Sequence, residues 1–87
     1  MAHMPDDEGA VVELDLTGLK CPLPALRTRK ALRDLEPGGR LVVLCTDPLA
    51  GVDIPNAARE AGGRVERLER DGPALRFILR RDGAPAP

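Results

Sequence analysis

The chain has 87 residues and a formal net charge of −1, which limits it to one small domain without an overall field that would attract nucleic acid or a membrane. Two cysteines are too few for a secreted disulfide scaffold, and no apolar run approaches the roughly 20 residues of a membrane span. The chain has no Trp or Tyr on which bases could stack, so direct nucleic-acid binding is not expected. We therefore expect a cytoplasmic protein that does not contact membranes.

Both ends of the chain are predicted to lie outside the folded domain. Residues 1–9 are polar and predicted to be disordered, and they begin with Met1-Ala2-His3-Met4, which resembles an expression remnant ahead of a native start at Met4. Residues 82–87 are predicted to be a disordered tail. A single domain is therefore expected over residues 10–81.

The first half of this domain predicts a strand, a helix and a second strand. Residues 10–16 (AVVELDL) have the alternation of a strand, with Glu13 and Asp15 outward. A helix is expected from about Pro24 to Leu35, where apolar and small residues recur on one face and Pro37-Gly38-Gly39 follows. The nearly continuous apolar run at residues 40–45 (RLVVLC) predicts a strand that is buried on both sides or strongly on one side.

The second half predicts a helix and two strands. Asp53 is the expected N-cap of the helix, with Pro55 in the first turn and Gly62-Gly63 at its end. Residues 64–70 break strict alternation, which favours an edge strand with a bulge. Residues 75–81 predict the last strand, with apolar side chains inward.

The resulting order is βαβαββ. A strand–helix–strand unit of this length gives parallel strands joined by a right-handed crossover. We therefore predict an α/β fold of the α+β type: a two-layer sandwich in which a four-stranded mixed sheet carries both helices on one face, and the last two strands form an antiparallel hairpin.

The segment Cys21-Pro22-Leu23-Pro24 is the main candidate site. Pro22 and Pro24 stiffen the entry to the first helix, since proline is tolerated only in a helix's first turn and keeps the preceding residue out of the α region. Gly18 is expected to supply backbone geometry in the preceding turn. With Cys21 as N-cap, the helix dipole would lower the thiol pKa from about 8.5 by less than one unit. These residues predict an accessible and moderately activated thiol that stays mostly protonated at neutral pH and needs a partner protein for full activation.

Two further residues are expected near Cys21. The carboxyl ends of parallel strands meet at one edge of a sheet, which would bring Cys45 and Asp47 towards Cys21. Cys45 is interpreted first as a small apolar residue at the end of a buried strand, and alternatively as a resolving thiol. Asp47 either forms a simple turn with Pro48 or supports the site.

The chain offers no good general base, because its only histidine, His3, lies in the presumed remnant. A cysteine enzyme that relies on a Cys/His pair is therefore not expected. A cysteine without a base can still accept sulfur from another protein's persulfide, which favours a carrier over a stand-alone catalyst. No metal site is expected, because two cysteines fall short of four ligands, and no cofactor is indicated.

The motif Asp15-x-x-Gly18-x-x-Cys21-Pro22-x-Pro24, followed by Asp47-Pro48 and Asp53-Ile54-Pro55, resembles the TusA/SirA-like family of sulfur-carrier proteins. The resemblance covers nearly everything from Val11 to Arg81. It implies a two-layer α/β sandwich in which Cys21 carries a persulfide, received from a cysteine desulfurase or a rhodanese-like protein. The implied destinations are tRNA thiolation, molybdenum-cofactor assembly and sulfur oxidation.

The sequence departs from the family pattern at one point and adds a second cysteine. Leu23 stands where some members have an acidic residue, so no acid/base role is assigned between the prolines. No role carries over to Cys45. The site expected from these arguments comprises Cys21 with the supporting residues Gly18, Pro22, Pro24 and Asp47.

Two other functions and one docking hypothesis stay open. The chain could be a non-enzymatic regulatory or adaptor domain, or a thiol redox protein that uses Cys21 and Cys45. Leu26, Arg27 and Lys30 lie on the first helix opposite its core face, among other basic residues. We hypothesise that this face docks an acidic patch on a sulfur donor or acceptor.

Overall fold

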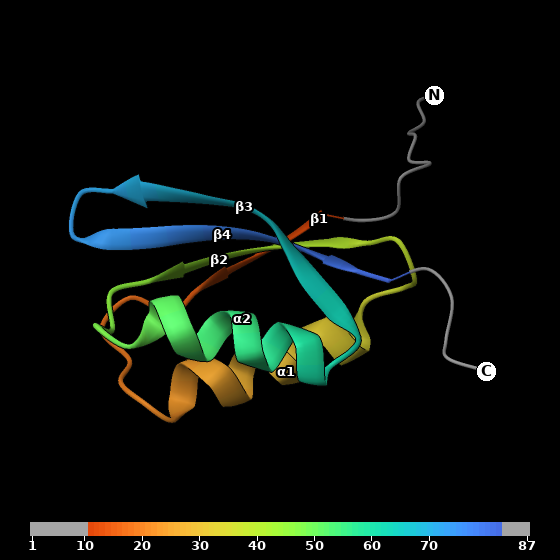
Figure 1. The fold of residues 1–87 in the computed structure, drawn as a ribbon, viewed down its shortest axis with the longest axis horizontal. Coiled ribbons are helices and arrows are strands. Elements are labelled where there is room, and N and C mark those ends of the chain that lie inside the picture. The colour runs from red at the N-terminus through yellow and green to blue at the C-terminus, as the bar shows by residue number, and fades with distance from the viewer. Residues whose placement is uncertain (1–10, 83–87) are drawn as a thin grey trace.

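The computed structural model describes residues 11–82, which form the predicted two-layer fold (Figure 1). The four strands form one sheet, and the two helices cover one of its faces. In chain order the elements are β1 (Val11–Asp15), α1 (Leu23–Asp34), β2 (Arg40–Cys45), α2 (Ala50–Glu60), β3 (Gly63–Asp71) and β4 (Ala74–Arg81). The predictions for residues 1–10 and 83–87 lie outside the described residues.

The sheet has the order β1-β2-β4-β3. β1 pairs in parallel with β2, while β4 runs antiparallel to both β2 and β3. Because β1 and β2 are parallel, both end at the same edge of the sheet, and α1 and α2 both begin there, at the left of Figure 1. This arrangement places the two strand-to-helix loops side by side.

The core lies between the sheet and the helices. In β2, Leu41, Val43 and Cys45 have no exposed surface, whereas the alternate residues Val42 and Leu44 are half-buried on the other face. This alternation confirms a strand that is strongly buried on one side. The single aromatic residue, Phe77, is also fully buried.

β3 is an edge strand, as predicted, and its register with β4 shifts between Val65 and Arg67. This irregularity accounts for the broken alternation in the sequence. The hairpin between the last two strands is confirmed. Within residues 11–82, no helix is long and apolar enough to cross a membrane.

Both helices begin earlier than the sequence predicted. α1 begins at Leu23 with Pro22 as its N-cap, so the expected N-cap role of Cys21 is wrong. α2 begins at Ala50, which places Asp53 inside the helix, so its expected N-cap role is also wrong. The reason is that the N-cap is Leu49, whose carbonyl accepts the Asp53 N–H at 2.9 Å, and a turn in which the Asp47 carbonyl accepts the Ala50 N–H at 2.9 Å leads into the helix.

Candidate functional site

Cys21 lies on the loop between β1 and α1, where it is exposed and free. The loop is compact because Leu19 donates its N–H to the Leu16 carbonyl at 3.1 Å, and Leu23 donates to the Lys20 carbonyl at 2.9 Å. Gly18 has φ = +84°, a left-handed conformation that glycine adopts at little steric cost. These turns hold the cysteine at the rim of the sheet.

Asp15 closes the beginning of the same loop. Its carboxylate accepts a hydrogen bond from the Thr17 N–H at 3.0 Å and another from the Thr17 hydroxyl. These bonds, the hydroxyl first, lower the pKa of Asp15 from its ordinary value. Asp15 therefore stabilises the turn that follows β1.

Hydrogen bonds join this loop to the loop between β2 and α2. Gly18 donates its N–H to the Thr46 hydroxyl at 3.0 Å, and Cys21 donates its N–H to Asp47 Oδ2 at 3.0 Å. Asp47 is only 8% exposed, so this charged acceptor is largely shielded from water. The structure thus brings Asp47 to the Cys21 backbone, across 26 positions in the chain.

The beginning of α1 offers the sulfur few N–H groups. Pro22 and Pro24 have none, and the Leu23 N–H is bonded to the Lys20 carbonyl. Cys21 also stands one residue before the N-cap. The prolines therefore shape the backbone around the thiol and do little to stabilise a thiolate through the helix terminus.

Two carboxylates act on the thiol itself. Partial loss of hydration raises the pKa of the Cys21 thiol; a hydrogen bond to the Asp53 carboxylate and the negative charges of Asp53 and Asp47 raise it further. The expected lowering of the thiol pKa is therefore wrong, whereas the expectation that the thiol stays mostly protonated at neutral pH agrees with the raised pKa. The helix dipole, which is expected to lower this pKa, is outweighed by the loss of hydration and by neighbouring negative charge.

The sequence argument missed Asp53 as a neighbour of Cys21, because Asp53 was assigned to cap α2. With α2 beginning at Ala50, Asp53 lies in its first turn, half-buried, where its carboxylate raises the pKa of the Cys21 thiol. A signal was present: Asp53-Ile54-Pro55 is one of the motifs on which the resemblance to the TusA/SirA-like family rests. A cap could explain the aspartate alone but not its occurrence within that motif.

Cys45 lies in the core next to the same carboxylates. It has no exposed surface and belongs to the core cluster, as expected for a small apolar residue at the end of β2. Burial raises the pKa of its thiol, partly offset by a hydrogen bond from the Asp47 backbone. Both cysteines are free thiols, Cys21 exposed and Cys45 buried.

The basic face of α1 is partly neutralised. Lys30 pairs with Asp34 at 3.3 Å, and Arg29 pairs with Glu60 of α2 at 2.8 Å. Arg27 is exposed and has no ion pair with any of residues 11–82. Of the basic residues predicted to dock a partner, Arg27 therefore has the most available charge.

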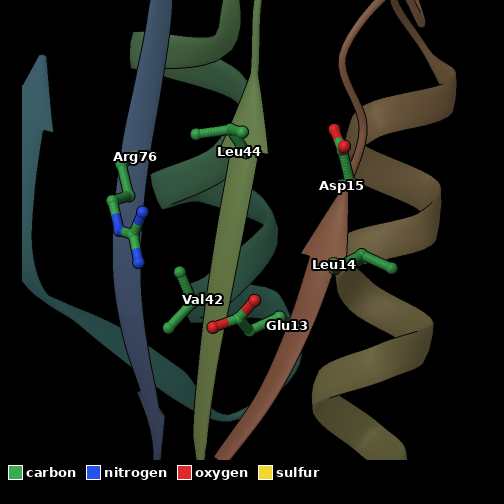
Figure 2. A pocket seen from close by; sticks show the side chains of 6 residues that line it. All are labelled: Glu13, Leu14, Asp15, Val42, Leu44 and Arg76. Carbon is green, nitrogen blue, oxygen red and sulfur yellow. The ribbon is translucent and has the colours of Figure 1, made fainter. Parts of the chain in front are cut away.

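A shallow hollow of about 110 Å³ lies on the opposite face of the sheet, with the helices behind it in Figure 2. Arg76 and Glu13 stand on either side of Val42 there. The full lining is Glu13, Leu14, Asp15, Val42, Leu44 and Arg76. It does not include Cys21. Within residues 11–82, no three or more Cys, Asp, Glu or His side chains are placed to hold a metal ion.

The fold and site define a class: a small α/β sandwich that exposes one cysteine where two parallel strands end. The family model for the sulfurtransferase TusA matches residues 12–81, and the chain belongs to this family. A solved structure of a SirA-like protein from Desulfitobacterium hafniense is similar, with a TM-score of 0.70 and 26% sequence identity. The match covers 82% of this chain and 97% of that one. Membership points to a sulfur-carrier role with donor and acceptor partners.

Replacing Asp53 with Asn should lower the pKa of Cys21, because the substitution removes the negative charge that opposes thiolate formation. The measurement is the rate of alkylation by iodoacetamide as a function of pH. The wild-type midpoint should lie above the ordinary value of about 8.5, and that of D53N should lie lower. D34N, at the far end of α1, is the control. Equal midpoints for D53N and wild type would contradict this account of the site.

Proposed function

We propose that this protein is a sulfur carrier that accepts sulfane sulfur as a persulfide on Cys21 and passes it to an acceptor protein. The observation that carries the proposal is the exposed, free thiol of Cys21, held at the rim of the sheet by Asp47 in a chain of the TusA family. An incoming protein can reach this sulfur without opening the core. The protein is thus a carrier and not a stand-alone catalyst.

The transfer of sulfur from a donor persulfide to Cys21 needs no outside oxidant. The Cys21 thiolate attacks the terminal sulfur of a donor persulfide, and a new S–S bond forms as the donor's S–S bond breaks. The electron pair of the broken bond goes to the donor cysteine, which takes up the proton that Cys21 lost. The Cys21 sulfur is oxidised to the level of a persulfide while the donor cysteine is reduced to a thiol. The second transfer, to an acceptor, repeats these steps with Cys21 as the leaving group.

The environment of Cys21 favours a partner-dependent first step. Asp53 and Asp47 raise the pKa of the thiol, so little thiolate is present at neutral pH in the free protein. A donor that supplies positive charge beside Asp53 would offset this effect. A cysteine desulfurase or a rhodanese-like protein fits the donor role, and tRNA thiolation, molybdenum-cofactor assembly and sulfur oxidation are the candidate pathways, all in the cytoplasm.

The alternatives make different demands on the cysteines. A thiol redox protein would use Cys45, whose complete burial weighs against it. An adaptor domain would need no reactive thiol at all. The loading of sulfur onto Cys21 therefore distinguishes a sulfur carrier from a redox protein and from an adaptor domain.

Mass spectrometry after incubation with a cysteine desulfurase and cysteine tests the proposal. Wild-type protein should gain the mass of one sulfur atom, and C21A should not. C45A is the matched control and should load like wild type, since its thiol is buried. Loading of C21A would contradict the assignment of the sulfur to Cys21, and loss of loading in C45A would favour the redox alternative. The absence of loading in wild type would favour the adaptor.

The docking hypothesis for α1 has a separate test. Replacing Arg27 and Lys30 with Glu should slow persulfide transfer from the donor by about tenfold at low salt and by less at high salt, because charge complementarity mainly accelerates encounter. The control is R64E, which reverses an exposed charge on β3. A normal transfer rate in the R27E/K30E variant would rule out an acidic docking patch on the partner.

A further inference from the structure

The face of the sheet that points away from the helices has no covering layer among residues 11–82 (Figure 1). Residues that are in register across a sheet point to the same face. On this face, the two outward residues of β2 are in register with acidic residues of β1 on one side and with residues of β4 on the other. We name these six side chains the open face: Glu13 and Asp15 on β1, Val42 and Leu44 on β2, and Arg76 and Ile78 on β4.

The middle of the open face is apolar. Val42, Leu44 and Ile78 are half-buried, and the first two line the hollow of about 110 Å³. A sheet face that meets water usually carries polar side chains, because they form the outward half of the alternation along each strand. Apolar side chains in this position are instead typical of a surface that binds a further layer.

Charges of opposite sign flank this apolar middle. Glu13 and Asp15 stand on β1, and Arg76 stands on β4, on the other side of β2 (Figure 2). None of these three side chains has an ion pair with any of residues 11–82. The open face is therefore acidic along one side and basic along the other.

Most of the other charge on this side of the sheet is already paired. The Glu66 carboxylate binds Arg40 at 2.9 Å and Arg80 at 3.3 Å. On β3, Arg67 and Glu69 bind each other at 2.7 Å. The charges that remain available to a partner are therefore those on either side of the apolar middle.

We propose that the open face binds a second copy of this chain, face to face, in a dimer whose two-fold axis runs parallel to the strands. Rotation about this axis lays the β1 side of each copy over the β4 side of the other, so Arg76 meets the carboxylates of Glu13 and Asp15 twice. An axis across the strands would instead lay β1 over β1, with carboxylate facing carboxylate. The charge pattern thus selects both the partner and its orientation, independently of the sulfur-carrier function.

The dimer leaves both reactive cysteines accessible. Cys21 does not line the hollow and lies at the rim where β1 and β2 end. An axis parallel to the strands keeps this rim at the same end of the dimer in both copies. Both thiols are therefore presented at one end of the dimer.

The size of the open sheet limits the strength of the dimer. Four strands of 5 to 9 residues, about 4.8 Å apart and about 3.3 Å long per residue, give a face of roughly 450 Å² in each copy. The two faces together bury about 900 Å², which is below the range of stable interfaces. We therefore expect a reversible dimer with a dissociation constant on the order of 10–100 µM.

Sedimentation equilibrium over a concentration series tests the proposal. Wild type should pass from monomer to dimer as its concentration rises. E13R and R76E should each raise the dissociation constant at least about tenfold, because each substitution places like charges at both symmetric contacts. An equimolar mixture of E13R and R76E should restore the wild-type value, since every facing pair in the mixed dimer is again of opposite sign.

The matched controls change the same kinds of side chain away from the open face. Arg27 is exposed on α1, and Glu36 is exposed just after it, so R27E and E36R should dimerise as wild type does. A second measurement needs no substitution: on dilution of wild type, NMR shifts of the Val42 and Ile78 amides should change, whereas that of the Thr28 amide, in α1, should not.

Three results would overturn the proposal. The first is wild-type protein that stays monomeric at about ten times the expected dissociation constant, which would leave the open face to a different partner or to none. The second is a dimer that E13R and R76E do not weaken, or whose shift changes lie on the helices, because a different surface would then hold it. The third is a mixture of E13R and R76E that associates no better than either variant alone, since the two charges would then not meet across the interface.

Discussion

The hydrogen bond from the Cys21 N–H to the Asp47 carboxylate is the interaction on which the site depends. It joins the two loops that follow the parallel strands, and its acceptor is almost completely shielded from water. A hydrogen bond to a charged group contributes about 1.5–3 kcal/mol, more than an ordinary one. Since Asp47 also accepts the first N–H of α2, a single residue sets both the position of the cysteine and the beginning of the helix that carries Asp53.

The Cys21 thiol is therefore exposed, and its pKa is raised above the ordinary value of a cysteine. Exposure lets a second macromolecule approach Cys21, whereas the neighbouring carboxylates favour its neutral form. A neutral thiol is a poor nucleophile, which limits unwanted oxidation and alkylation between transfers. Under the proposed carrier function, selectivity comes from the partner, because a protein that offsets the negative charge beside Cys21 increases its thiolate fraction.

Much of the fold could be predicted from the sequence, since Leu41, Val43 and Cys45 alternate with less buried residues and the βαβ order dictates parallel strands. Cys21 stood out because prolines flank it. The electrostatics of the site could not be predicted, because a local motif shows what precedes a helix and not which side chains of another loop face it. Pro55 was assigned to a first turn, which misplaced the start of α2 and with it Asp53. Contacts between the loops, such as that of Gly18 with Thr46, depend on the assembled sheet.

Hydrogen exchange of the Cys21 amide is the most direct test of whether the Asp47 carboxylate holds Cys21 in place. Measured by NMR in wild type and D47A, exchange of this amide should be slow in wild type and at least about tenfold faster in the variant, as the loss of a bond to a charged acceptor requires. The amide of Val43, in the middle of β2, should exchange at the same rate in both if the sheet is intact. Equal exchange of the Cys21 amide in the two proteins would mean that Asp47 does not hold the cysteine in place, and the account of the site would be wrong.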